Sequence, residues 1–317
     1  MNKKVVVLGG GTGMSNLLSG LKKYPLDITA IVSVCDDGKS TGILREEFNI
    51  PAVGDIRRVL VALSETEPLV MKLFNHRFNT TSDLDGHTVG NLLLTASSEI
   101  SGNLSDGIEA LSKVLNLKGK VVPLTEDNVT LMAEMIDGSI IEGEHNITQS
   151  KGKIKKVYYK NDAIPTKEAL NAIKEADLIL FSMGSLFTSI IPNLLIKEVV
   201  EEIEKSSAKI MYVCNMMTQP GETEKFSVSD HVKKLNEYLN TRKVDIVLVN
   251  KGKIDEEMAK FYETQEQKDP VVFDKQELKK MDIKYIADDF TYITDNNLLR
   301  HDNIKLGFHI FYHLMKK

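Results

Sequence analysis

The sequence predicts an α/β fold with a doubly wound, mainly parallel sheet, because two patterns recur along it. Short apolar, β-rich runs alternate with helical patterns, and a cluster of Gly, Asn, Asp or Ser follows each run. Continuous apolar runs are typical of parallel strands that are buried on both faces. Such sheets bind ligands at the carboxyl ends of their strands. The predicted strands are Lys4–Leu8, Ile28–Val34, Leu178–Met183, Ile210–Cys214 and Asp245–Val249.

The alternation is interrupted between the second and third of these strands. Residues 55–116 predict a helical insertion, and residues 129–160 predict antiparallel strands with polar turns at 137–139 and 150–152. The helices expected in the insertion are Asp55–Ser64, Pro68–His76, Gly90–Ser101 and Ser105–Asn116. We therefore expect one α/β domain over residues 1–317 that contains a helical insertion and a β-rich segment.

The composition argues against several classes of protein. The chain has 40 basic and 45 acidic side chains and no basic tail, so nucleic acid is not an expected partner. No apolar run approaches the ~20 residues that span a bilayer, and the first residues lack the pattern of a signal peptide. Two cysteines are too few for a disulfide scaffold. These features predict a reduced, cytoplasmic protein without membrane insertion.

Four glycines within five positions follow the first predicted strand. Residues 9–13 read Gly-Gly-Gly-Thr-Gly, and the residues after them have helical spacing. Glycines let the backbone approach a bound group, and the start of a helix offers unpaired N–H groups to a phosphate. Met14 occupies the third glycine position of the dinucleotide motif, so a tight turn without a ligand is the alternative. The ligand-binding candidates here are Gly10, Gly11, Thr12 and Gly13.

Two adjacent carboxylates follow the second predicted strand. Asp36 lies 25 residues after Gly11, near the spacing at which dinucleotide enzymes place an acidic residue on a ribose hydroxyl. Asp36 and Asp37 together could also hold Mg²⁺ on a substrate phosphate, since hard cations prefer carboxylate oxygens. For one of the two, an Asx-rich turn is the alternative. Gly38-Lys39-Ser40 is not a Walker loop, because Ser33 stands where that motif needs its leading glycine.

Further polar residues open the helical insertion. Asp55 stands in a position that resembles a helix N-cap, and capping alone would explain it. Arg57 and Arg58 lie near the start of the same helix, where the helix dipole disfavours cations, which indicates that they face an anion. Small and polar groups precede the helix that contains Asn91. We therefore include Asp55, Arg57 and Asn91 among the ligand candidates.

Two polar turns follow the third and fourth predicted strands. Residues 184–189 precede a helix expected near Ile190 and form a second candidate anion site. Residues 215–223 carry amide and hydroxyl groups suited to a base or a sugar. Near the C-terminus, an arginine could add a positive charge to the same cleft. The candidates in these segments are Gly184, Ser185, Thr188, Asn215, Thr218, Gln219, Gly221, Glu222, Thr223 and Arg300.

Eight motifs occur in an order that is typical of one family. They are GGGTG at 9–13, DDGKSTG at 36–42, GDIRR at 54–58, GHTVGN at 86–91, GSLFTSIIPNLL at 184–195, YVCNMMTQPGET at 212–223, DH at 230–231 and LRHD at 299–302. Together they resemble the YvcK-like branch of the CofD-like family, which is related to 2-phospho-L-lactate transferase. The resemblance implies a Rossmann-like three-layer fold and a cytoplasmic gluconeogenesis factor needed for cell shape on gluconeogenic carbon sources. It also implies a nucleotide-sugar ligand such as UDP-N-acetylglucosamine, or NAD.

The CofD branch of this family is enzymatic, so the resemblance carries a second hypothesis. That branch transfers a phospholactyl group with Mg²⁺, and its metal ligands correspond to Asp37 or Asp36 and to Asp55. Lys39 replaces the second glycine that the family places after the aspartates, which puts a cation near the carboxylates. The two hypotheses are thus a regulatory nucleotide-binding protein and a Mg²⁺-dependent transferase. Neither assigns a catalytic residue, and a homodimer is expected by analogy alone.

Overall fold

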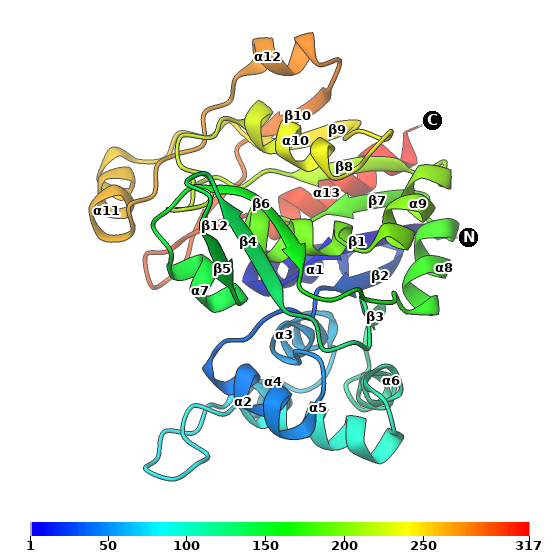
Figure 1. Cartoon of the computed structure of the whole chain (residues 1–317). Coiled ribbons are helices and arrows are strands. Elements are labelled where there is room, and N and C mark those ends of the chain that lie inside the picture. Colours follow the sequence, from blue (N-terminus) through cyan, green and yellow to red (C-terminus); the bar gives the residue numbers. More distant parts are fainter. Residues whose placement is uncertain (1, 317) are drawn as a thin grey trace.

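A seven-stranded parallel sheet forms the centre of the computed structural model, which describes residues 2–316 (Figure 1). Its strand order is β10-β9-β8-β7-β1-β2-β3. The strands are β1 (Lys3–Gly9), β2 (Leu26–Val32), β3 (Lys120–Pro123), β7 (Leu178–Phe181), β8 (Lys209–Val213), β9 (Ile246–Asn250) and β10 (Lys284–Asp288). The predicted α/β fold class with a mainly parallel sheet is therefore confirmed.

Five of the seven strands were predicted, each with ends within two residues of those observed. The sequence did not predict β3 and β10, which are the two edge strands. An edge strand is less deeply buried than a central one, so it lacks the continuous apolar run that marked the others. Every residue of β10 is at least partly exposed, whereas all four residues of β7 are buried.

Helices cover both faces of this sheet. The chain moves from β1 to β2 in one direction and from β7 to β8 in the other, and right-handed crossovers then place the connecting helices on opposite faces. On one face α1 (Gly11–Leu21) packs against α3 (Gly54–Leu63) and α13 (Asn303–Met315). On the other face α8 (Lys167–Glu175) packs against α9 (Lys197–Lys205), and α10 (Val228–Glu237) packs against α12 (Lys275–Lys280).

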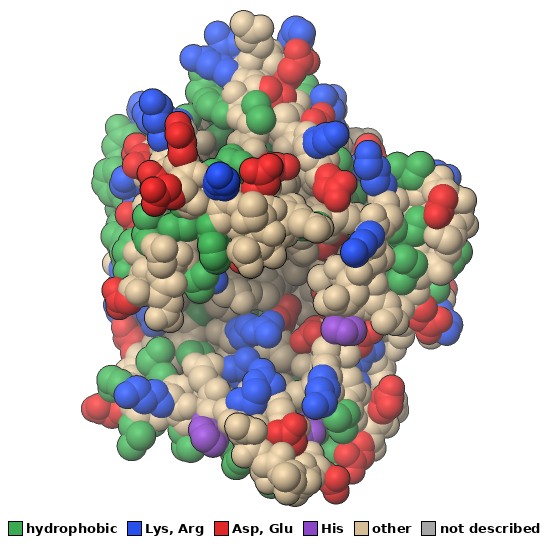
Figure 2. Space-filling model, turned by 90° about the vertical axis from the view of Figure 1, so that its left-hand side faces the viewer, with side chains coloured by type: hydrophobic (Ala, Val, Ile, Leu, Met, Phe, Trp, Pro, Cys, Tyr) green, Lys and Arg blue, Asp and Glu red, His purple; other side chains and the backbone are tan. Residues whose placement is uncertain are grey.

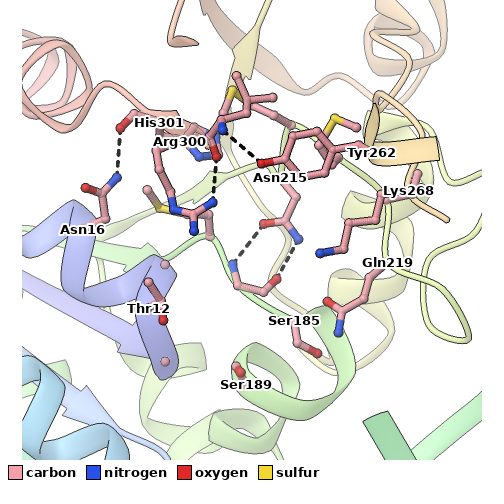
Figure 3. A pocket seen from close by; sticks show the side chains of 18 of the residues that line it. Thr12, Asn16, Ser185, Ser189, Asn215, Gln219, Tyr262, Lys268, Arg300 and His301 are labelled. Atoms are coloured by element: carbon pink, nitrogen blue, oxygen red, sulfur yellow. Dashed lines mark hydrogen bonds between the residues drawn. The ribbon is translucent and has the colours of Figure 1, made fainter. Parts of the chain in front are cut away.

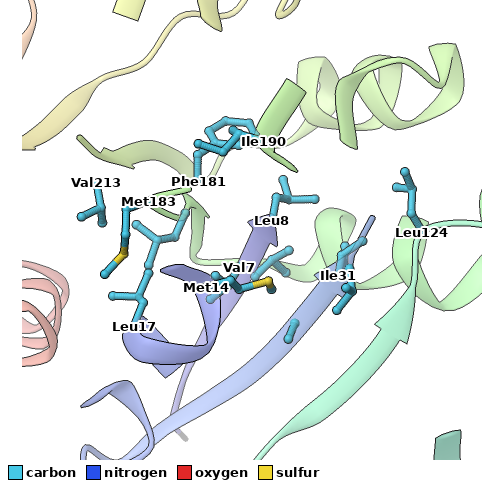
Figure 4. Close-up of a cluster of buried hydrophobic side chains, with 14 of the residues drawn as sticks. Val7, Leu8, Met14, Leu17, Ile31, Leu124, Phe181, Met183, Ile190 and Val213 are labelled. Carbon is cyan, nitrogen blue, oxygen red and sulfur yellow. The ribbon is translucent and has the colours of Figure 1, made fainter. Parts of the chain in front are cut away.

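Part of the core surrounds β1, which lies between β2 and β7 (Figure 4). Val7 and Leu8 of β1 and Phe181 of β7 are fully buried. Met14 of α1 is also fully buried and packs into this cluster. The strand order reverses between β1 and β7, and open α/β sheets bind ligands in the crevice at such a point. The core thus anchors the two turns that follow β1 and β7.

The helices of the insertion lie together on one side of the sheet (lower part of Figure 1). It comprises α2 (Lys39–Phe48), α3, α4 (Pro68–Asn75), α5 (Val89–Ser101) and α6 (Leu104–Val114). All but α2 were predicted, with small differences at the ends. No helix in the described part of the chain, residues 2–316, is long and apolar enough to cross a membrane.

A small antiparallel sheet follows the insertion, as the sequence predicted. Its order is β5-β4-β6, with β4 (Leu131–Met135), β5 (Ile140–Glu142) and β6 (Ile154–Tyr159). The short helix α7 (Glu144–Gln149) lies between β5 and β6 and was not predicted. The remaining elements are the π-helix η1 (Leu186–Ile190), the 3₁₀-helix η2 (Ile191–Leu194), α11 (Glu256–Glu266) and the hairpin of β11 (Thr291–Ile293) with β12 (Leu299–His301).

The contact between α1 and α13 gives a first prediction. A Cβ atom added to Gly20 would lie 1.9 Å from the carbonyl oxygen of Asn303, so there is no room for a side chain. Gly20→Ala should lower the free energy of unfolding by about 1–3 kcal/mol, although alanine is the better helix former by about 1 kcal/mol. Ser19→Ala on the same helix is the control and should be nearly neutral. Urea unfolding measures both, and an unchanged Gly20→Ala variant would contradict the packing of α1 on α13.

Candidate functional site

A cavity of about 460 Å³ opens at the carboxyl ends of β1, β7 and β8. Figure 2 shows this face of the molecule hollowed, with Lys and Arg side chains gathered along the lower side of the hollow. The turns after β1 and β7 and the loop after β8 form much of the wall, and α11 and β12 supply the rest. We call it the ligand cavity. Its place at the reversal of strand order is the one expected for a ligand site.

The glycine turn after β1 lies on the wall of the ligand cavity, as predicted for Gly10, Gly11, Thr12 and Gly13. Gly11 has a φ of +68°, which disfavours a residue with a side chain. At Gly13 a Cβ atom would lie 2.2 Å from the Met183 carbonyl oxygen. The glycines therefore allow two turns to touch, in addition to exposing backbone N–H groups at the start of α1. Met14, in the third glycine position of the motif, is a core residue instead.

Two cationic side chains line the ligand cavity, and none of its described lining residues is Asp or Glu. Arg300 of β12 donates to the Leu299 carbonyl oxygen at 2.8 Å (Figure 3). The Lys268 ammonium group forms an ion pair with the Glu266 carboxylate, with 2.5 Å between Nζ and Oε2. The chain as a whole has a net charge of −5. The lining of the cavity thus carries two cations, of which Lys268 is paired with Glu266, and the positive end of the α1 dipole adds to them.

Apolar side chains form another wall of the ligand cavity. Met216, Tyr262 and Leu299 belong to a small cluster that is separate from the main core, and Met217 packs against it. The Tyr262 hydroxyl accepts a hydrogen bond from the Leu299 backbone N–H at 3.0 Å. Such a surface suits the face of a sugar or a base beside the charged part of the cavity.

His301 connects three segments at the edge of the cavity. Its Nε2 atom lies 3.2 Å from the Cys214 carbonyl oxygen, and its own carbonyl oxygen accepts a hydrogen bond from Asn16 at 2.9 Å. Burial lowers the pKa of His301 to about 4, so the ring is neutral at pH 7 and donates from Nε2. His301 therefore fixes β12 against α1 and β8, which places Arg300 at the cavity.

The turn after β7 binds an anion that belongs to the protein itself. The Glu222 carboxylate accepts hydrogen bonds from the Phe187 backbone N–H at 3.2 Å and from the Ser185 hydroxyl. Gln219 donates to the other carboxylate oxygen at 2.8 Å. Ser185 also caps η1 by accepting from the Thr188 N–H, so the helix begins at Leu186 and not near Ile190 as predicted. The second candidate anion site is thus filled from within the chain.

Other side chains of the loop after β8 hold the loop in shape. Asn215 clamps the backbone of Gly184, accepting from its N–H at 3.0 Å and donating to its carbonyl oxygen at 2.7 Å (Figure 3). The Thr218 hydroxyl accepts from the Asp269 N–H, and the Thr223 hydroxyl accepts from the Gln219 N–H, both at 2.9 Å. These polar residues therefore stabilise the conformation of the loop, independently of any ligand.

The carboxylates after β2 lie outside the lining of the ligand cavity. Asp36 accepts from the Gly38 N–H at 3.0 Å and from the Thr41 hydroxyl at 3.2 Å, and Asp37 accepts from the His145 N–H at 2.7 Å. Burial, with Asp36 nearby, raises the pKa of Glu144 to about 7. Each of the two aspartates thus has a structural partner, and Asp36 is close enough to Glu144 to affect its charge.

Asp55 lies at the start of α3, directly behind the glycine turn. A Cβ atom at Gly10 would lie 2.6 Å from its carboxylate, which also accepts a hydrogen bond from the Gly11 N–H. Asp55 pairs with Arg58 at 2.5 Å, and burial raises its pKa. Val53 occupies the N-cap position, so the interpretation of Asp55 as a cap was wrong. The residue instead supports the turn that faces the ligand cavity.

Arg57 and Asn91 form a buried pair inside the helical insertion. Arg57 donates to the Asn91 side-chain oxygen at 3.0 Å and to that of Asn75. Burial lowers the pKa of Arg57 to about 10, with Arg58 and Arg77 adding to the effect. In this structure Arg57 therefore meets neutral amide groups and does not line the ligand cavity.

The residues present fit a metal ion only in part. No three His, Cys, Asp or Glu side chains within residues 2–316 are grouped so that they could hold a metal ion. Mg²⁺ is commonly held by one or two carboxylates together with substrate phosphates, and Asp36, Asp37 and Asp55 are of that donor type. The prediction of a metal site at Asp37 and Asp55 stays a prediction.

Comparison with known proteins places the chain in a family. Residues 5–291 match the family described as 2-phospho-L-lactate transferase CofD. The chain belongs to the CofD family. It is 48% identical to the gluconeogenesis factor of Bacillus subtilis, with 96% of each chain covered, and 45% identical to that of Halalkalibacterium halodurans, with 96% of this chain and 94% of that protein covered. A crystal structure of a Bacillus halodurans protein matches with a TM-score of 0.94 at 45% identity, over 98% of this chain and 99% of that one.

About half of the predicted site residues of this CofD-family protein line the ligand cavity. Those that do are Gly10, Gly11, Thr12, Gly13, Gly184, Ser185, Asn215, Thr218, Gln219 and Arg300. Those that do not are Asp36, Asp37, Asp55, Arg57, Asn91, Thr188, Gly221, Glu222 and Thr223.

Other lining residues were missed by the sequence reasoning. Asn16 lies one turn beyond the predicted glycine turn, so helical spacing could have found it, whereas Ser189 lies in the predicted segment 184–189 but was not chosen as a candidate. Tyr262 and Lys268 come from a charged stretch to which no function was assigned, and no local pattern distinguishes them.

Glu222 gives a prediction about pH. Burial raises its pKa to about 7 from an ordinary 4.5. Between these two values the folded protein holds a proton that the unfolded chain has lost, so this residue makes stability fall as the pH rises. Relative to Glu222→Gln, the wild type should therefore lose on the order of 2 kcal/mol of unfolding free energy between pH 4.5 and 7.

Urea unfolding across this pH range measures the difference. Glu224→Gln removes an exposed carboxylate from the same loop and is the matched control, with an expected pH profile like that of the wild type. Parallel profiles for the wild type and Glu222→Gln would contradict the assignment.

Proposed function

We propose that this CofD-family protein is a gluconeogenesis factor that binds a nucleotide sugar of the UDP-N-acetylglucosamine type, or a dinucleotide such as NAD, in the ligand cavity. One observation carries the proposal: the glycine turn at the start of α1 faces a cavity lined by Lys268 and Arg300 and, among its described lining residues, by no carboxylate. A diphosphate is the group that such a turn and two cations suit.

The remaining parts of the ligand are assigned by the chemistry of the walls. The backbone N–H groups of the glycine turn bind the diphosphate, and Asn215, Thr218 and Gln219 lie where a base or sugar would follow. Asp36 and Asp37, on the β2 side of the turn, accept hydrogen bonds from ribose or sugar hydroxyls. Binding without turnover makes the protein a regulator, in keeping with the name that its relatives carry. The proposed role is support of cell shape on gluconeogenic carbon sources.

A Mg²⁺-dependent transferase is the second candidate, and one observation favours it. Burial, with the Asp36 carboxylate nearby, raises the pKa of both Asp55 and Glu144, so carboxyl groups lie near one another at the edge of the sheet where the glycine turn lies. Carboxylates of this kind hold Mg²⁺ on a substrate phosphate, and the metal then neutralises charge that develops on the leaving group. The name of the matching family describes such a transferase.

Thermal-shift titration with UDP-N-acetylglucosamine, NAD and GTP, each with and without Mg²⁺, separates the two functions. The regulatory function predicts stabilisation by a nucleotide sugar or by NAD that does not depend on Mg²⁺ and yields no product. Product formation that requires Mg²⁺ would favour the transferase. Absence of any response to these ligands would overturn the proposed binding site.

The two cations of the cavity give a third prediction. Lys268→Gln and Arg300→Gln should each weaken binding of UDP-N-acetylglucosamine about tenfold, because each removes a charge-assisted hydrogen bond worth roughly 1.5–3 kcal/mol. Isothermal titration calorimetry measures the affinity. Lys260→Gln on α11 removes an exposed charge that does not line the cavity, and its affinity should equal that of the wild type. Equal affinities for all the variants would exclude a diphosphate between Lys268 and Arg300.

Asp37 gives a fourth prediction. Asp37→Asn keeps an oxygen that can accept the His145 N–H, so the melting temperature should stay close to that of the wild type. The loss of charge should weaken binding of a sugar hydroxyl or of Mg²⁺ severalfold. Calorimetry with UDP-N-acetylglucosamine in the presence and absence of Mg²⁺ distinguishes these contacts. Binding like that of the wild type under both conditions would show that Asp37 only forms the turn.

A further inference from the structure

The C-terminal helix α13 exposes a continuous apolar stripe. Ile304, Phe308, Tyr312 and Met315 are 49%, 50%, 54% and 57% exposed. Their spacing of three and four residues places them on one side of the helix. The rings of Phe308 and Tyr312 stack with their centroids 5.9 Å apart, so the middle of the stripe is aromatic. We call these four side chains the α13 stripe, and none of them lines the ligand cavity.

The helix that carries the α13 stripe is firmly packed on the protein. On its opposite side Leu306 and Ile310 are fully buried. Tyr24, which follows α1, stacks on Phe311 with 5.4 Å between the ring centroids, and its hydroxyl donates to the Ile304 carbonyl oxygen at 3.0 Å. The α13 stripe is therefore preformed, and a partner can bind it without the cost of ordering a helix.

The two helices of this face contribute only positive charge to it. α1 and α13 pack against each other on one face of the sheet. Residues 11–25 and 303–316 contain four lysines and two histidines but no Asp or Glu, although 45 of the 317 residues of the chain are acidic. Asp302 caps the N-terminal end of α13, and Asp288 of β10 pairs with His309 at 2.8 Å. The carboxylates that contact α13 there lie towards its N-terminal half.

Further lysines gather at the C-terminal end of the α13 stripe. Burial lowers the pKa of His313, and Lys209, Lys284 and Lys316 lie close enough to add to the effect. Lys209 and Lys284 are the first residues of β8 and β10. The Lys316 Nζ atom lies 5.9 Å from the centroid of the Tyr312 ring. The aromatic part of the stripe thus lies directly beside a group of cations.

A cavity of about 350 Å³ at the start of β8, β9 and β10 adds one more lysine. Its charged lining residues are Lys209, Lys243, Lys284, Asp245 and Asp282. The Asp245 carboxylate accepts a hydrogen bond from the Ile210 backbone N–H at 2.7 Å and lies 3.9 Å from Arg242. Since Asp245 has these partners of its own, the lysines of the cavity are opposed mainly by Asp282.

An apolar, partly aromatic stripe beside lysines suits the surface of an anionic membrane. The apolar side chains of such a helix enter the boundary between headgroups and acyl chains, and the lysines meet lipid phosphates. The stripe is the outer side of a single helix, and a fluid bilayer adapts to a ridge of this shape. A second copy of the chain suits the stripe less well, because a symmetric interface would bring two sets of lysines together.

We propose that α13 docks this protein on the surface of a membrane that contains anionic lipid. The α13 stripe enters the headgroup boundary, and Lys209, Lys284 and Lys316 face the lipid phosphates. This is adsorption to the surface and needs no spanning helix. Because α13 covers a face of the sheet, whereas the ligand cavity opens at the strand ends, docking leaves that cavity open (Figure 1). The inference does not depend on which ligand the cavity binds.

Co-sedimentation of the full chain with lipid vesicles tests the docking. The wild type should bind vesicles of equal parts phosphatidylcholine and phosphatidylglycerol about tenfold more tightly than vesicles of phosphatidylcholine alone. Raising the NaCl concentration from about 0.1 M to about 1 M shortens the Debye length from about 10 Å to about 3 Å and should release the protein. Absence of binding to the anionic vesicles, or equal binding to both kinds of vesicle, would overturn the proposal.

Two variants with matched controls assign the contact to α13. Phe308→Gln removes the centre of the stripe, and its control is Leu73→Gln on α4, where the side chain is 52% exposed. Lys316→Glu reverses a charge beside the stripe, and its control is Lys167→Glu, the same change at an exposed position of α8 on the other face. Phe308→Gln and Lys316→Glu should each weaken binding to the anionic vesicles about tenfold, whereas both controls should bind as the wild type does. Equal binding by all five proteins would contradict docking through α13.

A fluorescence measurement shows whether the stripe itself enters the lipid. The chain has no tryptophan, so a single introduced one reports only on its own surroundings. Anionic vesicles should shift the emission of Tyr312→Trp to shorter wavelength and leave that of Leu73→Trp unchanged. An unshifted emission of Tyr312→Trp in protein that has sedimented with the vesicles would overturn the proposed orientation.

Sedimentation velocity without lipid identifies a second copy as the other possible occupant of the stripe. A monomer that binds anionic vesicles would support the proposal. A wild-type dimer that Phe308→Gln converts to a monomer, with no vesicle binding by either protein, would show that the stripe is an interface between copies. That result would overturn membrane docking.

Discussion

The close approach of two turns at the reversal of strand order is the constraint on which the whole site depends. β1 and β7 are neighbours in the sheet, so the turns that follow them meet, and Gly13 leaves no space for a side chain against the Met183 carbonyl oxygen. Asn215 then clamps Gly184 from β8. This contact explains why glycine is needed at position 13, although Met14 replaces the third glycine of the dinucleotide motif. It also brings the start of α1 to the ligand cavity.

Internal carboxylates decide which of the polar turns is open to a ligand. Glu222 occupies the turn after β7, and Asp55 supports the glycine turn from behind while it pairs with Arg58. Burial raises the pKa of both carboxyl groups. The anion site that stays open is therefore the glycine turn, beside which Lys268 and Arg300 lie. Both cations come from segments that follow β9 in the chain. The two cations thus lie beside the turn that no internal carboxylate occupies.

The ligand cavity and the carboxylates that follow β2 lie at different parts of one edge of the sheet. The ligand cavity lies on the β7 and β8 side of the glycine turn, whereas Asp36 and Asp37 follow β2 and lie outside the lining of that cavity. The proposed nucleotide site is therefore compatible with either proposed role of the carboxylates, contact with sugar hydroxyls or with a metal ion.

The sequence by itself determined the sheet, the central strands and the position of the glycine turn, because local patterns of apolar residues and glycines encode them. It also located the loops that line most of the cavity, since strand ends of a parallel sheet share one edge. Only the tertiary structure decided which polar side chains are available to contact a ligand. Arg57 and Glu222 have partners far away in the chain, and Tyr262 and Lys268 reach the cavity through the folding back of α11. Long-range contacts of this kind leave no periodic pattern in the sequence, so the charge and openness of the site follow from the fold alone.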